Sequence, residues 1–138
     1  MVNAREYNDL RKGTWVGELG IEITNVEQGR LLAEVQVRPQ LLSPNGFLHA
    51  AAVVGLADSL CGCGTMEHLP QGSRGYTTVE LKANLVGTAR SGIIECEATL
   101  VHSGRTTQVW DATVRGKESG KAIALFRCTQ MILYPEAK

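Results

Sequence analysis

The stretch "NGFLHAAAVVGLADSLCGCG", residues 45–64, carries one charged side chain, Asp58, among alanines, valines, leucines and glycines. Its composition and length predict a helix from His49 to about Met66, which would be about 25 Å long. Each internal glycine lowers the helix propensity by about 1 kcal/mol. We therefore expect this helix to be buried on nearly every side, with another backbone lying close to its small residues. An aspartate in such a helix needs a partner, a neutral state or a function.

The periodicity of this helix separates two faces. At 100° per residue, Asp58 lies on a face of small, weakly polar residues, and the opposite face is apolar. The small face holds Ala51, Val54, Gly55, Cys61, Gly62 and Thr65, and the apolar face holds Val53, Leu56, Leu60 and Cys63. The apolar face is the expected core stripe, so Asp58 is expected to point across the small face toward a cleft.

The segments around this helix have the patterns of strands. Residues 3–12 predict a short amphipathic helix, and residues 19–37 alternate with period two around a turn, which is typical of a β-hairpin. After Gly75 four more strand-like segments follow, separated by turn signals; they span residues 76–87, 92–104, 105–116 and 121–134. Because the connections are short, we expect neighbouring strands to pair antiparallel.

These elements predict one α+β domain over residues 1–138, an antiparallel sheet wrapped around one long central helix. The strands carry apolar residues on both faces, as at Val109 and Trp110 or Leu125 and Phe126. A free sheet edge and a second apolar face are liabilities unless they are covered. Pairing with a second copy would cover them, so at least a dimer is expected.

Composition narrows the class of protein. Lysine plus arginine equals aspartate plus glutamate, 14 each, which argues against binding nucleic acid or a membrane surface through bulk charge. The N-terminus lacks the apolar core of a secretory signal, and no run reaches the roughly 20 apolar residues of a membrane span. The four cysteines lie in apolar or alternating segments, which favours a reduced, cytoplasmic protein. Cys61 and Cys63 would point about 160° apart on a helix, so no metal site is expected.

Four segments resemble one family. The run "GFLHAAAVVGLAD", residues 46–58, is similar to the G-x-x-H-G-G-x-x-x-x-L-A-D/E signature of hotdog-fold acyl-CoA thioesterases, in particular the PaaI-like branch acting on phenylacetyl-CoA and 4-hydroxybenzoyl-CoA. The segments "VELKANLVG", "ATLVHSGRTTQVWDATV" and "ALFRCTQMIL" also look like strands of that family. The resemblance covers roughly residues 15–134. It implies a hotdog fold, thioester hydrolysis, and a dimer with two interface sites that often assembles into a tetramer.

The resemblance also assigns roles to residues. The family's catalytic carboxylate lies nine residues after the histidine, which is Asp58 here, and the backbone N–H that polarises the thioester carbonyl belongs to Ala50. Where the family has H-G-G, this chain has histidine followed by two alanines. Many relatives hold substrate or water with an Asn or Gln six residues before the histidine. Ser43 stands at that position and Asn45 two residues later, and either could take the role.

The chemistry of these groups fits thioester hydrolysis. A carboxylate such as Asp58 can take a proton from water or attack the carbonyl directly through an anhydride. The first N–H groups of a helix lack internal partners and lie at the positive end of its dipole, so Ala50 N–H, with or without Ala51 N–H, could stabilise the oxyanion. The alternative is that this region only caps its own helix. For His49 we favour a hydrogen-bonding role that fixes the loop-to-helix geometry over general base catalysis.

Further residues are candidates for contacts to coenzyme A and the acyl group. The run "GRTT" contains Arg105, Thr106 and Thr107, whose donors suit phosphates and an amide-rich arm. The alternative for this run is an ordinary hairpin with a surface arginine. Arg74 is a further phosphate candidate. Gly62 and Thr65, one and two turns beyond the aspartate, are candidates for the acyl side.

The leading hypothesis is therefore a cytoplasmic acyl-CoA thioesterase that needs no cofactor, with coenzyme A present only as part of substrate and product. A hotdog dehydratase of hydroxyacyl thioesters is a second hypothesis, since such enzymes also place a histidine and a carboxylate at a subunit interface. A non-catalytic acyl-CoA-binding protein is the third. Aryl and medium-chain acyl groups are both compatible with the sequence.

Overall fold

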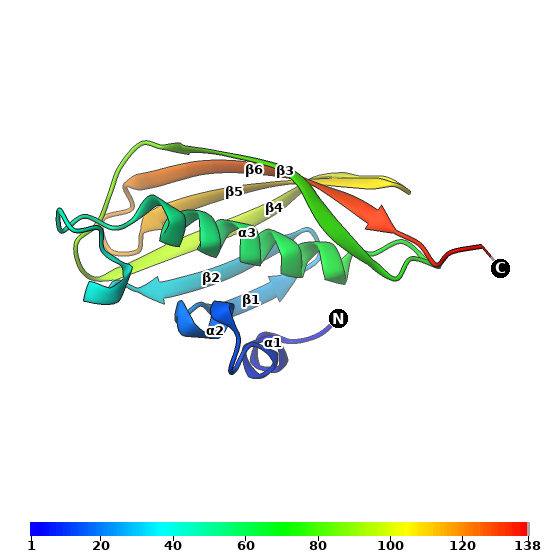
Figure 1. Cartoon of the computed structure of the whole chain (residues 1–138), viewed down its shortest axis with the longest axis horizontal. Coiled ribbons are helices and arrows are strands. Elements are labelled where there is room, and N and C mark those ends of the chain that lie inside the picture. Colours follow the sequence, from blue (N-terminus) through cyan, green and yellow to red (C-terminus); the bar gives the residue numbers. More distant parts are fainter. Residues whose placement is uncertain (138) are drawn as a thin grey trace.

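The computed structural model describes residues 1–137, in which one six-stranded antiparallel sheet curves around the long helix α3, Ala50–Glu67. The strand order is β1-β2-β4-β5-β6-β3 (Figure 1). The strands are β1 (Glu22–Glu27), β2 (Arg30–Gln36), β3 (Gly75–Leu85), β4 (Ile93–Ser103), β5 (Thr107–Gly116) and β6 (Ala122–Leu133). The predicted α+β architecture, an antiparallel sheet wrapped around one long helix, is confirmed.

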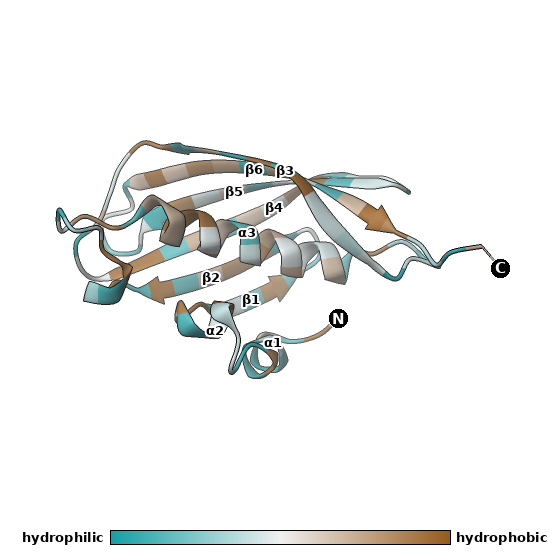
Figure 2. Cartoon of the chain, in the orientation of Figure 1, coloured by the Kyte–Doolittle hydropathy of each residue, from teal (hydrophilic) through white to brown (hydrophobic). Residues whose placement is uncertain are grey.

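Helix α3 begins one residue after the predicted start, with His49 as its N-cap, and ends within one residue of the predicted end. Its apolar stripe is buried as expected: Leu56 and Leu60 are fully inaccessible to solvent and Val53 is nearly so. The stripe packs on the inward side chains of the sheet, and Figure 2 shows apolar residues recurring along α3 and along the strands behind it. This contact forms the core.

The glycines of α3 make room for aromatic rings. A Cβ atom at Gly55 would lie 2.8 Å from the Trp15 ring, and one at Gly64 would lie 2.5–2.7 Å from Trp110. At Gly62 it would collide with the Tyr76 hydroxyl. Side chains lie against these glycines, where another backbone was expected. Of the rings, Trp110 is fully buried, and its burial helps to offset the low helix propensity of the glycines.

The N-terminal segment adds two short helices. The predicted helix over residues 3–12 is confirmed as α1, Ala4–Leu10. A second turn of helix, α2 (Trp15–Glu18), was not predicted, because Trp, Val and Gly are weak helix formers. The predicted hairpin therefore begins later than residue 19, at the start of β1. A 3₁₀ turn, η1 (Pro39–Leu41), follows β2.

One prediction about strand pairing was wrong. Strands β4, β5 and β6 pair in order, but β3 pairs with β6 and occupies the opposite edge of the sheet from β1. In Figure 1 the chain between β3 and β4 crosses the left end of the sheet. Residues 86–92 can span up to roughly 25 Å when extended, while three strand spacings need only about 15 Å. A connection of this length permits a crossover as readily as a hairpin.

Within residues 1–137, no helix is both long and apolar enough to cross a membrane.

Candidate functional site

Asp58 lies half-buried near the middle of α3. Its Oδ1 atom is buried and has no hydrogen-bond partner among the described residues, and none of their cations forms an ion pair with it. Burial raises the pKa of Asp58 above the ordinary aspartate value. The sequence leaves three possibilities for Asp58, which are a partner, a neutral state or a function. No partner is observed among the described residues. An unpaired, partly desolvated carboxylate is the state that suits a base or a nucleophile.

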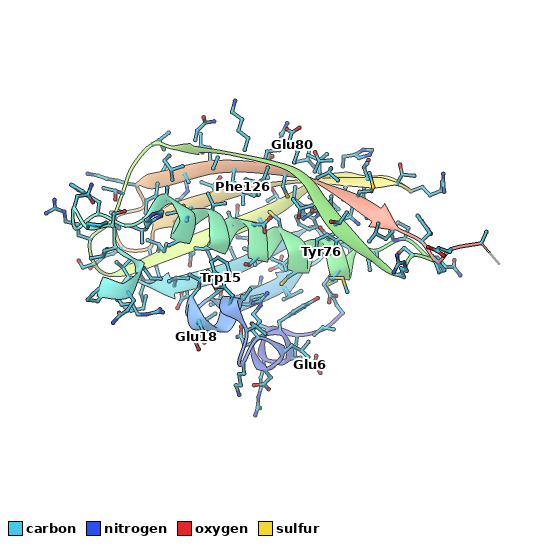
Figure 3. All side chains as sticks on the ribbon, in the orientation of Figure 1. Glu6, Trp15, Glu18, Tyr76, Glu80 and Phe126 are labelled. Atoms are coloured by element: carbon cyan, nitrogen blue, oxygen red, sulfur yellow. The ribbon has the colours of Figure 1, made fainter. Side chains whose placement is uncertain are left out.

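Two aromatic side chains flank Asp58 along the helix. Trp15 of α2 lies on Gly55, one turn before the aspartate, and Tyr76 of β3 lies on Gly62, one turn after it. Figure 3 labels Trp15 and Tyr76 beside α3. Sequence reasoning missed both residues, since no local pattern connects them to α3.

The start of α3 offers one free backbone donor. His49 Nδ1 accepts a hydrogen bond of 2.9 Å from the Ala51 N–H, so this ring holds the loop-to-helix geometry. The Ala50 N–H has no acceptor among residues 1–137, and Ala50 is exposed. Of the two candidate oxyanion donors, Ala51 is therefore occupied and Ala50 is available.

The two candidates for the family's Asn or Gln lie in the loop before α3. Asn45 uses its side-chain Oδ1 to accept the Phe47 N–H at 3.2 Å, which closes a local turn. Ser43 is half-buried, and its backbone N–H donates to the Phe47 carbonyl at 2.7 Å. The amide oxygen of Asn45 is thus engaged in the loop, which leaves Ser43 as the less constrained candidate.

A hollow of about 250 Å³ adjoins the start of α3. Its mostly apolar lining includes Trp15, Leu41, Leu42, His49 and Ala51. It is slightly smaller than the roughly 300–1,000 Å³ of sites for drug-sized ligands. The hollow is therefore an apolar space bordered by the N-cap and by Ala51 and Ala52 of the first turn of α3.

The distance between the oxyanion donor and the carboxylate is set by the helix. Ala50 and Asp58 are eight residues apart, which is about 12 Å along the axis. A carbonyl must lie within about 3 Å of its oxyanion donor and of its attacking group. The Ala50 N–H and the Asp58 carboxylate of one chain therefore cannot act on the same carbonyl.

Two arginines that are far apart in sequence both contact Tyr134, just beyond the end of β6. The Arg105 guanidinium lies 5.9 Å from the centre of the Tyr134 ring, and Arg74 Nε donates to the Tyr134 carbonyl at 3.2 Å. The Tyr134 hydroxyl donates to the Arg105 carbonyl at 2.5 Å. Tyr134, which sequence reasoning did not single out, thus brings Arg74 and Arg105 together. Thr106 is exposed beside them and Thr107 begins β5.

The predicted acyl-side residues lie inside the subunit. Thr65 is fully buried, and its hydroxyl donates to the Cys61 carbonyl one turn earlier in the helix at 2.9 Å. Gly62 is covered by the Tyr76 hydroxyl. Their proposed contact with substrate stays a prediction.

The cysteines are free thiols buried in the core. Cys61 contacts Cys128 of β6, whereas Cys63 contacts Arg11, so the two helical cysteines point apart as expected. In the described part of the chain no three His, Cys, Asp or Glu side chains are grouped as metal ligands.

Comparison with known proteins places this geometry in a family. Residues 45–123 match the model of the thioesterase superfamily. The chain is 29% identical over 111 residues to a 1,4-dihydroxy-2-naphthoyl-CoA hydrolase of Listeria monocytogenes, an alignment that covers 80% of this chain and 89% of the relative.

Solved structures agree. The chain superposes on a mutant of thioesterase PA1618 from Pseudomonas aeruginosa with a TM-score of 0.91 and 28% identity, covering 96% and 95% of the two chains. The PaaI protein of Escherichia coli shares the fold, with a TM-score of 0.80 and 20% identity over 93% and 90% of the chains. The chain belongs to the thioesterase superfamily, with the hotdog fold of its PaaI-like members, and is a thioester hydrolase.

Proposed function

We propose that this enzyme hydrolyses an acyl-CoA thioester to the free acid and coenzyme A, with Asp58 as the group that initiates attack. The observation that carries this proposal is the half-buried Asp58 carboxylate, whose Oδ1 has no protein partner. Leaving a carboxylate oxygen unpaired costs free energy, and sites that bear such a cost are commonly functional.

In the proposed reaction the thioester carbonyl oxygen accepts a hydrogen bond from the Ala50 N–H. Asp58 takes a proton from water and the oxygen of that water adds to the carbonyl carbon. The tetrahedral intermediate then expels coenzyme A as the C–S bond breaks. Alternatively, Asp58 adds directly, coenzyme A leaves, and water hydrolyses the resulting anhydride. Single turnover in ¹⁸O-labelled water separates the two, because only anhydride formation followed by attack at the enzyme carbonyl places label in Asp58.

The proposed site is shared between two copies of the chain. Since the Ala50 N–H and Asp58 are about 12 Å apart on one helix, a complete site combines Ala50 of one subunit with Asp58 of the partner subunit. The edge strand β3 supports such a dimer, because its apolar side chains are exposed; these are Val79, Leu81 and Leu85. A dimer with two interface sites, and a tetramer built from it, are the assemblies we propose.

Coenzyme A is proposed to leave past the strand ends near Tyr134, where Arg74 and Arg105 lie. Both guanidiniums are anchored near Tyr134 and exposed, as a phosphate site requires. Thr106 and Thr107 add hydroxyl groups at the start of β5. His49 is proposed to hold the helix start, and Ser43 or Asn45 to orient substrate or water.

An aromatic acyl group is the proposed substrate class. The Listeria relative is named for a naphthoyl-CoA substrate, and the hollow at the start of α3 is bordered by Trp15. Flat acyl groups gain about 0.5–1.5 kcal/mol from aromatic contacts beyond the burial of area. A panel of aryl and medium-chain acyl-CoA thioesters tests this class.

The first experiment measures thiol release from that panel by wild type and Asp58→Asn. We expect at least a 10²-fold loss of kcat for the variant with every thioester. Equal turnover by the two proteins would reject the role of Asp58. Loss of water from a hydroxyacyl thioester without thiol release would instead identify a dehydratase, and tight binding without either reaction a binding protein.

A second experiment removes the oxyanion donor. Proline lacks an N–H and is favoured at the first position of a helix, and His49 already has φ −68° and ψ 134°, which a following proline permits. Ala50→Pro should therefore fold normally and lose about 10²–10³-fold in kcat.

Mixing the two inactive variants tests the shared site. A heterodimer of Asp58→Asn and Ala50→Pro subunits would contain one site with both defects and one intact site. Random reassociation should recover about a quarter of wild-type activity. No recovery, with heterodimers demonstrated by mass spectrometry, would show that each site uses one chain.

A further inference from the structure

The two edges of the sheet differ in how they are covered. Strand β3, at one edge, leaves the apolar side chains of Val79 and Leu81 exposed. Strand β1, at the other edge, has helix α1 beside it (Figure 1). A bare edge strand presents backbone N–H and C=O groups with which another chain can pair. The cover over β1 therefore bears on which contacts between copies can form.

Asn8 of α1 bonds to β1 as a residue of a neighbouring strand would. Its Oδ1 accepts a hydrogen bond from the Ile23 N–H at 2.8 Å, and its Nδ2 donates to the Ile23 carbonyl at 3.0 Å. Both backbone groups of Ile23 therefore point away from β2. In an antiparallel sheet, two opposite residues of a hydrogen-bonded pair exchange these same two bonds. The amide of Asn8 thus takes the place of one residue of a seventh strand.

Helix α1 is held mainly by polar side chains. None of its residues 4–10 is buried, and besides Asn8 the Tyr7 hydroxyl donates to Glu67 at 2.6 Å. The chain is anchored directly after the helix, where Arg11 is buried and contacts Cys63. A seven-residue helix has little stability of its own, and segments with few buried contacts open locally at low cost. Helix α1 can therefore lift from β1 while the core stays folded.

A second copy of the chain carries the groups that fit the uncovered edge. With Ile23 of two chains opposite each other, each N–H donates to the other carbonyl, so both backbone groups of each Ile23 regain a partner. In this antiparallel register Glu22 faces Thr24 of the partner subunit, so no like charges lie directly opposite each other. The contact is two-fold symmetric, as contacts between identical chains commonly are.

We propose that the β1 edge is a docking surface for a second copy of this chain, and that α1 keeps it closed through Asn8. While α1 is in place, copies can meet only at other surfaces, such as the exposed edge of β3. When α1 lifts, the β1 edges of two assemblies pair around Ile23. Copies joined at both sheet edges form an open chain, so the cap also limits the size of the assembly. This inference does not depend on the reaction assigned to Asp58.

The direct test compares wild type and Asn8→Ala by amide hydrogen exchange and sedimentation velocity. The Ile23 amide should exchange about tenfold faster or more in the variant, because α1 loses both bonds to β1. The mass should rise with concentration to at least about twice that of wild type. Asp9→Ala is the matched control, since Asp9 is the next residue of α1 and pairs with Lys12. It should change neither readout.

Two outcomes of this comparison would overturn the proposal. If the Ile23 amide exchanges no faster in Asn8→Ala, Asn8 does not keep the edge closed. If exchange is faster and the mass stays that of wild type at every concentration, the open edge is not a docking surface for a second copy.

A charge at Thr24, which is exposed next to Ile23, distinguishes this contact from aggregation of a disturbed fold. In the Asn8→Ala background, Thr24→Glu places a glutamate opposite Glu22 of the partner subunit and should restore the wild-type mass. Thr24→Lys in the same background places a lysine opposite that glutamate and should retain or increase association. Both differences should shrink at high salt. Association that ignores the sign of this charge would overturn the proposal.

Discussion

Two glycines of α3, Gly55 and Gly64, each lie under a tryptophan ring, and the two rings differ in how freely they can move. Trp15, which lies over Gly55, is 62% exposed, whereas Trp110, which lies over Gly64, is fully buried. A ring at the surface can swing away from an added methyl group, but a ring in a close-packed core cannot. The same substitution, glycine to alanine, should therefore change the free energy of unfolding in opposite directions at the two positions.

Gly64→Ala should destabilise the protein by about 1–3 kcal/mol through overpacking against Trp110. Gly55→Ala should be neutral or stabilising by up to about 1 kcal/mol, because alanine has the higher helix propensity. Urea unfolding of both variants measures the difference. Similar destabilisation at the two sites would show that Trp15 is held as firmly as Trp110.

The charged form of Asp58 should lower the free energy of unfolding, which makes the protein less stable at neutral pH than a variant with a neutral side chain there. Its pKa is raised in the folded state, so the folded protein binds a proton more tightly than the unfolded chain. Stability therefore falls as pH rises from the ordinary aspartate value of 3.8 through the higher folded value. Asp58→Asn should stabilise the protein at about pH 8, by the roughly 0.5–2 kcal/mol common for such changes, and progressively less toward about pH 4. Urea midpoints across this range check it, and a gain independent of pH would contradict it.

At the scale of elements, the start of α3 depends on one side chain. His49 has the extended backbone of an N-cap, and its ring accepts a hydrogen bond from the Ala51 N–H. The same bond leaves Ala50 as the free donor. The cap thus stabilises the helix and leaves the Ala50 N–H as the donor available to the proposed oxyanion site.

His49→Ala should lose about 1 kcal/mol of stability, because the Ala51 N–H loses its acceptor. His49→Asn keeps a capping oxygen and should stay within a few tenths of a kcal/mol of wild type. Thermal unfolding of the two variants is the measurement. If the asparagine variant is as unstable as the alanine variant, the ring contributes by packing instead of by capping.

At the scale of the whole molecule, β3 is an edge strand with apolar side chains left exposed. Leu81 is 43% exposed there, and Val101 on β4 is 50% exposed at a different part of the surface. Because the two side chains are similarly exposed, Val101 is a suitable control position for a substitution at Leu81. Only Leu81 lies on the proposed dimer edge.

Leu81→Lys should convert the proposed dimer to monomers and abolish thiol release, since a lysine on an edge opposes strand pairing and the proposed site needs two chains. Val101→Lys should retain both assembly and activity. Sedimentation velocity and the thioester assay provide the readouts. An active monomeric Leu81→Lys variant would contradict a site shared across this edge.

Local patterns were sufficient for most of the elements. The length of the apolar run predicts α3 within one residue at each end, and the period-two segments predict all six strands, because both depend on residues close in sequence. The resemblance of residues 46–58 to the family signature, in which the carboxylate follows the histidine by nine residues, identifies Asp58 and the Ala50 N–H as candidates. The turn α2 was missed, since four residues are too few to show a period.

The sequence by itself determined that an apolar helix lies against an antiparallel sheet, with one aspartate among small residues. Only the tertiary structure decided that β3 crosses to the far edge, that Arg74 and Arg105 both contact Tyr134, and that Tyr76 lies on Gly62, one turn from Asp58. These contacts join segments far apart in the chain, and their register is set by packing of the whole core instead of by any local preference.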